Sequence, residues 1–288
     1  MARKVDAYLE DTPAKHGKKP NQKLKPYVVL QYLLKYTDEN NVATAFDIIG
    51  YDGVELSAIQ GMCEHLVLDA WETQAPLVKA AAQEAGVELL SMEVASLDEE
   101  RLTKAFQAAR YLGIPVVNVG PGGKSDVEED FVASVNTLTA RAKLAAEYGV
   151  MLCCKAHVNS AIYSTPTTQR AMNEIQLDSF GVDMDPSHIH RAGEKPEEAL
   201  AQVVSRMGHV HIRDCKGPGP GPGAPADQAC GRGEINLVGY FKALVDAGYE
   251  GPVCLEVIGP ELTVQQAQAI ASESYGYMNA ILKGMNAR

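Results

Sequence analysis

From Pro26 onward, short apolar runs rich in β-branched residues alternate with longer amphipathic stretches. The short runs have the length of buried strands, and the longer ones carry apolar residues at helical spacing. Regular alternation of this kind is typical of βα units, in which helices cover a parallel sheet. The order of elements therefore predicts an α/β fold.

The count of elements predicts how the sheet is closed. Eight candidate strands span residues 27–33, 53–56, 87–94, 115–119, 150–155, 181–185, 209–213 and 253–257. Eight candidate helices span residues 38–49, 69–85, 98–112, 128–148, 167–175, 196–206, 237–247 and 264–283. An open doubly wound sheet would carry G-x-G-x-x-G after its first strand, and that motif is missing here. We therefore expect a single (β/α)₈ barrel.

The beginning of the chain differs from the rest. Residues 1–25 are polar and rich in lysine, and they show neither helical nor strand periodicity. We interpret them as an N-terminal extension and residues 26–288 as one barrel domain, which matches the usual size of such barrels. The sequence does not indicate what the extension does.

Composition narrows the possible partners and the compartment. A net charge of −11 provides no basic surface for nucleic acid or for an anionic membrane, so a small molecule is the better partner. The six cysteines form no C-x-x-C pair, which indicates reduced thiols. We see no signal peptide and no apolar stretch of membrane-spanning length, and we therefore predict a cytoplasmic protein.

Polar side chains gather where four consecutive candidate strands end. In a barrel of this kind, active residues project from the C-terminal ends of strands and from the loops that follow them. Because strand side chains alternate between two faces, residues two apart share a face. The sequence therefore predicts an active site made from these strand ends, with Lys155, His157, Asp183, Asp185, His188, His209, His211, Arg213, Asp214 and Glu256 as its candidates.

Four segments carry a more specific pattern. They read G-V-D-M-D-P-S-H-I-H-R-A-G at 181–193, H-V-H-I-R-D at 209–214, G-R-G-E-I-N at 231–236 and V-C-L-E-V at 253–257. The pattern resembles the sugar phosphate isomerase/epimerase family, which has the xylose isomerase-like barrel and includes ketose 3-epimerases, hydroxypyruvate isomerase and inosose dehydratase. The resemblance extends from Gly53 through the C-terminal helix.

The resemblance implies a set of site residues. In that family a divalent ion is held by Glu, Asp, His and Glu. The last three correspond to Asp185, His211 and Glu256 of this chain, and His188 and Arg213 correspond to substrate contacts. The first position departs from the pattern. Family members have a strand ending like L-A-L-E-N-H, whereas residues 152–157 read L-C-C-K-A-H, so that Lys155 replaces the first carboxylate.

This lysine changes the charge of the implied metal site. Three carboxylates and a neutral imidazole carry about −3, whereas a lysine with two carboxylates carries about −1, so divalent affinity should fall. Two outcomes are open. The ammonium of Lys155 can replace the metal by bridging Asp185 and Glu256. Alternatively, Asp185, His211 and Glu256 still hold Mn²⁺, Mg²⁺ or Zn²⁺, and the ion depresses the lysine pKa until the amine serves as a base.

Several further candidates have two interpretations each. Glu55 and Glu93 lie near strand ends and either bind substrate hydroxyls or accept structural hydrogen bonds. His157 is a candidate substrate contact. The Pro/Gly-rich segment 216–233 contains prolines that exclude a helix, and it is either a lid over the barrel mouth that brings Arg232 to the substrate, a contact with a neighbouring subunit, or a solvated linker.

The remaining histidine of the strand ends, His209, lies on the same face as His211 and can lie too deep in the barrel for chemistry. We expect the protein to work as a homo-oligomer or as a subunit of a larger complex.

These residues suit proton abstraction next to a carbonyl, with a cation stabilising the enediolate. In our interpretation Lys155 or Glu256 moves the proton, the metal or the ammonium polarises the carbonyl together with His188, and Arg213 orients hydroxyls. The sequence thus predicts an isomerase or epimerase acting on a ketose or a related polyhydroxylated carbonyl compound. A lyase that dehydrates its substrate or cleaves an oxidised glycoside would use the same step. A non-catalytic ligand-binding barrel is the third possibility.

Overall fold

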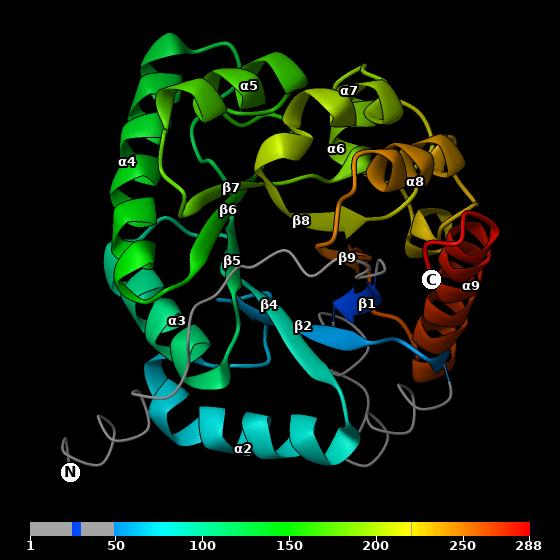
Figure 1. Ribbon diagram of the computed structural model, residues 1–288, viewed down its shortest axis with the longest axis horizontal. Coiled ribbons are helices and arrows are strands. Elements are labelled where there is room, and N and C mark those ends of the chain that lie inside the picture. The colour runs from blue at the N-terminus through cyan, green and yellow to red at the C-terminus, as the bar shows by residue number, and fades with distance from the viewer. Residues whose placement is uncertain (1–24, 30–48, 220) are drawn as a thin grey trace.

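The computed structural model describes residues 25–29, 49–219 and 221–288, and they form a closed barrel of parallel strands surrounded by helices (Figure 1). The barrel strands are β1 (Lys25–Val29), β2 (Gly53–Ile59), β4 (Glu88–Glu93), β5 (Val116–Val119), β6 (Met151–Lys155), β7 (Phe180–Asp183), β8 (Met207–Ile212) and β9 (Pro252–Leu255). Each pairs with its neighbours in parallel, and β1 pairs with both β9 and β2, which closes the sheet. The predicted (β/α)₈ barrel is confirmed.

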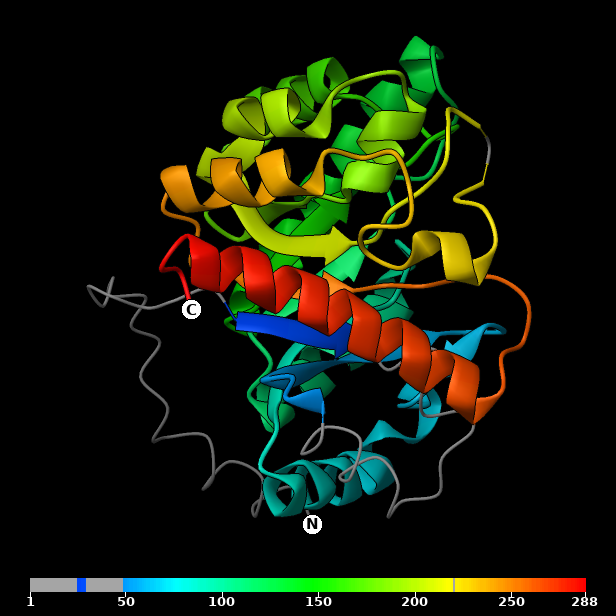
Figure 2. The same ribbon diagram turned by 90° about the vertical axis from the view of Figure 1, so that its right-hand side faces the viewer.

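The helices form the outer layer of the barrel (Figure 1). They are α2 (Trp71–Ala85), α3 (Glu99–Leu112), α4 (Glu128–Glu147), α5 (Thr165–Glu174), α6 (Pro186–Arg191), α7 (Pro196–Val203), α8 (Leu237–Asp246) and α9 (Val264–Gly284). Figure 2 shows α9 lying along the outside of β1, which it contacts. A two-residue strand, β3 (Cys63–Glu64), adds to β2 in the antiparallel direction.

Local sequence signals explain where helices begin and end. Asp98 caps α3 by accepting a hydrogen bond from the backbone N–H of Arg101, and Gly113 ends that helix in the left-handed conformation. Helix α5 begins at Thr165, two residues before the predicted start. The reason is a capping box, in which Ser164 and Thr167 bond each other's backbone N–H groups.

Some segments differ from the prediction. Strand β7 ends at Asp183 rather than Asp185, because Asp185 caps the unpredicted helix α6 and Pro186 occupies its first position. The prolines of segment 216–233 were expected to exclude a helix. Pro225–Gln228 nevertheless form one 3₁₀ turn, which accommodates a proline at its start.

Parts of the prediction lie outside the described residues. They are the extension 1–24, the end of the first strand and nearly all of the helix expected at 38–49. Among the residues that are described, no helix combines the length and the apolar character needed to cross a bilayer. The cysteines whose side chains are described, namely Cys153, Cys154, Cys215, Cys230 and Cys254, are buried free thiols, as predicted.

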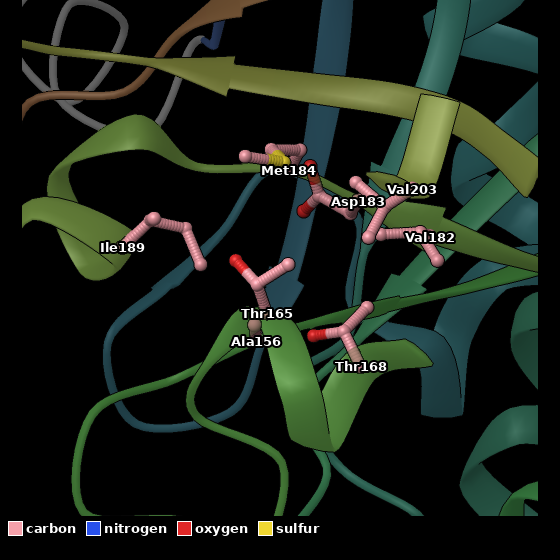
Figure 3. Close-up of a pocket in the computed structure, with 8 residues that line it drawn as sticks. All are labelled: Ala156, Thr165, Thr168, Val182, Asp183, Met184, Ile189 and Val203. Atoms are coloured by element: carbon pink, nitrogen blue, oxygen red, sulfur yellow. The ribbon is translucent and has the colours of Figure 1, made fainter. Parts of the chain in front are cut away.

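A narrow internal space lies between β7 and the helices outside it (Figure 3). It is lined mostly by apolar groups, and it is too narrow for a water molecule. Asp183 borders it, but both carboxylate oxygens of Asp183 bond to histidines of β8. We therefore regard this space as a packing gap rather than a binding site.

Small residues are required at the amino-terminal end of the barrel interior. A Cβ atom at Gly208 would lie 2.5 Å from Met151 Sδ and 2.7 Å from Cys153 Sγ. Gly181 faces the same two sulfur atoms at 2.8 Å each. These glycines let the side chains of β6 fill the barrel next to β7 and β8.

We expect Gly208→Ala to lower the free energy of unfolding by about 1 to 3 kcal/mol, because the added methyl group overpacks this interior. Gly276 is exposed within α9, and a Cβ atom added there would meet no other atom within 4 Å. Gly276→Ala should therefore stabilise the protein by up to about 1 kcal/mol through helix propensity. Urea titration of both variants measures the two effects. Equal stability of Gly208→Ala and the wild type would contradict the packing argument.

Candidate active site

The deeper polar layer of the barrel is organised by Asp183 at the end of β7. Its Oδ1 accepts hydrogen bonds from His209 Nδ1 at 3.0 Å and from the backbone N–H of His211 at 3.1 Å. Its Oδ2 accepts a bond from His211 Nδ1. All three side chains are completely buried. Asp183 therefore fixes the orientation of both β8 histidines.

Glu55 of β2 completes this layer from the opposite side of the barrel. Its carboxylate accepts hydrogen bonds from His211 Nε2 at 2.8 Å, from Asn118 Nδ2 at 2.7 Å and from Ser91 Oγ. His209 Nε2 lies 3.1 Å from the same carboxylate. Glu55 is fully buried, so these contacts favour the second of its two interpretations, a structural hydrogen-bond acceptor.

Charge is balanced within this layer. Burial opposes protonation of His211, but Asp183 and Glu55 outweigh it and raise the pKa of the imidazole well above its usual value. Burial likewise opposes ionisation of Asp183, but His211 and His209 hold the pKa of that carboxyl well below its usual range. His211 is therefore an imidazolium between two carboxylates, with both ring nitrogens engaged.

The outer polar layer contains Lys155 at the end of β6. Its ammonium donates to Glu93 Oε1 of β4 and to Glu256 Oε2, directly after β9, at 3.1 Å each. Arg213 Nη2 contacts the same Glu256 oxygen at 3.2 Å. One of the two outcomes left open by the sequence was an ammonium bridge from Lys155 to Asp185 and Glu256. The second carboxylate of the observed bridge is Glu93, because Asp185 bonds to Arg213.

These contacts shift the three ionisable groups differently. Burial opposes the charge of Lys155, but Glu256 and Glu93 raise the pKa of its amine well above the usual value. Burial also opposes the charge of Glu256, but Arg213 and Lys155 lower the pKa of its carboxyl to about 2. For Glu93 burial prevails, and the pKa of its carboxyl is raised. The layer therefore pairs an ammonium with a firmly ionised carboxylate and with a carboxyl that protonates more readily.

Arg213 follows β8 and connects this layer to helix α6. Its Nη2 donates to Asp185 Oδ2 at 2.7 Å, and its Nε donates to Ser187 Oγ at 2.8 Å. Asp185 Oδ1 accepts the backbone N–H of Ser187 at 2.8 Å and so caps α6. Asp185 thus has an internal partner on each carboxylate oxygen.

His188 lies next to Arg213 at the mouth of the barrel. Its Nε2 is 3.1 Å from Arg213 Nη2, and the backbone N–H of Val158 donates to its Nδ1 at 3.2 Å. Burial and the charge of Arg213 lower the pKa of this imidazole well below its usual value, so His188 is neutral. The ring of His157, an exposed residue, packs against it at a tilt of 40°, with 4.1 Å between ring centres. The structure thus brings His157, His188 and Arg213 together, and their role as substrate contacts stays a prediction.

Arg232 is not brought to this cluster. It forms an ion pair with Glu273 of α9, and both side chains are substantially exposed. Asp214, at the end of β8, accepts hydrogen bonds from the backbone N–H groups of Cys215, Gly231 and Ile235. Asp214 therefore anchors the segment 216–233 instead of facing the cluster.

Sequence reasoning missed four residues that build the site. Ser91 and Asn118 contact the deeper layer, and Ser187 and Arg191 contact Arg213 and His188 from α6. Ser91 lies two residues before Glu93 and Asn118 interrupts an apolar strand, so strand alternation could have found these two. Ser187 and Arg191 gave no such signal, since α6 itself was not predicted.

Two groups of side chains in the described part of the chain have ligand atoms close enough to hold a metal ion. They are Glu55, His209, His211 and Cys254, and Glu93, His211 and Glu256. Asp185, which the family resemblance implies as a ligand, belongs to neither group. The structure therefore does not assemble the expected set of Asp185, His211 and Glu256.

The donor atoms of these groups are engaged in internal contacts. The ammonium of Lys155 bonds two carboxylates of the second group, and both ring nitrogens of His211 face carboxylates. Burial raises the pKa of the Cys254 thiol in the first group well above its usual value. In this arrangement the residues fit an internal ammonium, and they do not fit a tightly held divalent ion.

Comparison with known proteins identifies the family. Residues 43–280 match the family described as xylose isomerase-like TIM barrel, and the chain belongs to it. The inosose isomerase of Halalkalibacterium halodurans is 24% identical over 246 residues, which are 78% of this chain and 86% of that protein. An inosose dehydratase of Clostridium botulinum is 26% identical over 141 residues, 45% of this chain and 47% of that one.

Solved structures show the same fold. The IOLI protein with a bound zinc atom has a TM-score of 0.74 at 20% identity, and the match covers 90% of this chain and 99% of that one. D-psicose 3-epimerase from Clostridium cellulolyticum H10, solved with D-tagatose, has a TM-score of 0.68 at 17% identity, with coverage of 90% and 98%. The family resemblance seen in the sequence is confirmed.

The pKa of Glu256 predicts how stability depends on pH. The folded-state pKa of about 2 lies below the usual value of 4.5, so the contribution of this carboxylate is fully present above about pH 4.5. It is lost as the pH falls toward 2, and its size is on the order of 2 kcal/mol. Glu256→Gln should therefore lose less unfolding free energy than the wild type between pH 6 and pH 3.

Denaturant titrations at both pH values measure this difference, with Glu147→Gln on the exposed face of α4 as the control. An acid-induced loss in Glu256→Gln equal to that of the wild type would refute the ionised state of Glu256.

Proposed function

We propose that this protein is an isomerase or epimerase that transfers a proton at the carbon next to the carbonyl of a ketose or a related polyhydroxylated compound. One observation carries the proposal. The buried ammonium of Lys155 lies between Glu93 and Glu256 at the strand ends of the barrel. A cation flanked by two carboxyl groups supplies the charge stabilisation and the proton carriers that an enediolate reaction needs.

The contacts support a role for each group of this cluster. An ammonium has no lone pair, so Lys155 does not accept a proton while its pKa is raised, and it serves as the electrophile. Of the two proton carriers expected from the sequence, Glu256 remains. Glu93 is the second carboxyl at the same ammonium, and the pKa values of the two are shifted in opposite directions. Carboxyl pairs separated in this way suit acid and base roles.

The side chains of this cluster can carry out the proposed reaction without a metal ion. One carboxylate removes the proton from the carbon, and the electrons move onto the carbonyl oxygen as an enediolate. Lys155 and Arg213 stabilise the negative oxygen by donating hydrogen bonds, and the neutral His188 lies beside Arg213 in the same cluster. Return of a proton to the former carbonyl carbon, together with transfer of the adjacent hydroxyl proton to the former carbonyl oxygen, gives isomerisation. Delivery of a proton by the second carboxyl to the opposite face of the carbon that lost its proton gives epimerisation.

The names of the relatives support both this activity and one alternative. An inosose isomerase and a D-psicose 3-epimerase agree with proton return, whereas the inosose dehydratases favour a lyase. In a lyase the same proton abstraction is followed by departure of hydroxide from the next carbon, which leaves with a proton as water. Analysis of product mass separates the two, because an isomerase conserves mass and a dehydratase loses water.

Substitutions of Lys155 test the electrophile. Wild-type protein treated with chelator should still exchange the substrate's α-proton for deuterium in D₂O, measured by NMR on a panel of ketoses and inososes. Lys155→Met should lower this rate at least about 100-fold, as removal of an oxyanion donor does. Lys155→Arg keeps the charge and should retain a measurable part of the rate.

Lys242→Met removes an exposed lysine of α8 that pairs only locally with Asp246, and it is the matched control. Exchange in Lys155→Met at the wild-type rate would remove Lys155 from the mechanism. Absence of exchange with every compound of the panel would favour the non-catalytic binding barrel.

Metal content tests the same assignment independently. Wild-type protein purified without chelator should contain less than one equivalent of tightly bound Mn²⁺, Zn²⁺ or Mg²⁺ by elemental analysis. Lys155→Glu should raise the occupancy, because it adds a carboxylate and removes the competing cation. A wild-type protein that keeps a full equivalent through chelator dialysis would show that the site retains an ion, and that the ammonium does not replace it.

A further inference from the structure

Arg213 carries a donor group that has no partner in the part of the chain that the structure describes. Its Nε bonds to Ser187, and its Nη2 contacts Asp185, Glu256 and His188. Its Nη1 is buried and has no hydrogen-bond partner among the described residues, although the side chain is only 1% exposed. A buried guanidinium N–H without an acceptor is costly, which marks this position as one where a ligand supplies the acceptor.

A second guanidinium converges on the same imidazole. Arg191, in the last turn of α6, has its Nη2 at 2.9 Å and 3.2 Å from the two ring nitrogens of His188. Its Nε donates to the backbone carbonyl of Ser187 at 3.1 Å, which holds the side chain along the helix, and it is only 8% exposed. Two buried arginines thus contact one neutral histidine.

The surrounding charges favour a further anion. Lys155 Nζ and Arg213 Nη2 both contact the same oxygen of Glu256, at 3.1 Å and 3.2 Å. Burial lowers the pKa of Arg191, the charge of Asp185 opposes this shift, and the positive charge of Arg213 adds to it. A further anion beside the two guanidinium groups would add to the compensation that Asp185 provides.

We propose that Arg191 and Arg213 form an anion-binding subsite that takes a carboxylate carried by the substrate. The substrate class is then a sugar acid with a keto group, and the neutral ketoses are poorer ligands. Planar guanidinium groups recognise carboxylates with two parallel hydrogen bonds, and Arg213 Nη1 is the donor available for one of them. The keto group in this substrate class rests on the proposed function, whereas the carboxylate does not depend on it.

The subsite is tested by equilibrium binding with a matched pair of compounds. D-gluconate and D-sorbitol differ only by a carboxylate in place of a hydroxymethyl group, and neither has a carbonyl to react. NMR titration at one ionic strength should show wild-type protein binding gluconate at least about tenfold more tightly than sorbitol, as a charge-assisted hydrogen-bond pair provides. Arg191→Met should bring this ratio close to one and leave sorbitol affinity within about threefold.

Arg110→Met, an exposed change in the last turn of α3, is the control and should keep the wild-type ratio. Arg191→Lys should keep an intermediate ratio, and it serves if the methionine variant does not fold by circular dichroism. Equal affinity of wild-type protein for gluconate and sorbitol would overturn the subsite, and so would an unchanged ratio in Arg191→Met. A tenfold ratio without any α-proton exchange would support the subsite and refute the proposed function. Exchange together with equal affinity for gluconate and sorbitol would support the proposed function and overturn the subsite.

Discussion

The fold of this protein depends on an ionic chain that crosses the barrel, from Asp183 of β7 through the imidazolium of His211 to Glu55 of β2. Buried charges are tolerated only when they are paired and hydrogen-bonded, and removal of one partner leaves the others uncompensated. Because the chain joins strands on opposite sides of the sheet, it fixes their relative positions as well as their charge. The positions in the outer polar layer depend on this chain, because Arg213 follows His211 by only two residues.

Lys155, which stands where the family resemblance implies a carboxylate, is tolerated because a second carboxylate lies within reach. Lys155 alone would be an unpaired buried cation next to Arg213. Glu93, on β4, gives the ammonium a partner that Glu256 cannot provide alone, since Glu256 also serves Arg213. The sequence shows Lys155 and its positive charge, but it does not show that Glu93 is its partner. Glu93 is 62 residues away in the chain, and only closure of the barrel brings the two together.

Strand and helix positions could be predicted from the sequence because periodicity and caps are local signals, and all eight barrel strands were found this way. The polar cluster was predictable at the level of strand ends, but not at the level of partners. Alternation could not distinguish Glu55 in the deeper layer from Glu93 in the outer layer. Helix α6 was too short for a periodic pattern, so Arg191 was missed. The cytoplasmic location, the oligomeric state and the N-terminal extension stay predictions.

The two polar layers of the barrel differ in how many hydrogen-bond acceptors their cations have. In the deeper layer both ring nitrogens of each histidine lie at carboxylates, so that these side chains hold one another in place. In the outer layer cations share acceptors, so that Lys155 and Arg213 compete for one oxygen of Glu256. A network that is short of acceptors is stabilised by an incoming negative oxygen, whether it is a carboxylate or a developing enediolate. In the proposed reaction, the shortage of acceptors for Arg213 among the described residues links substrate binding to proton transfer.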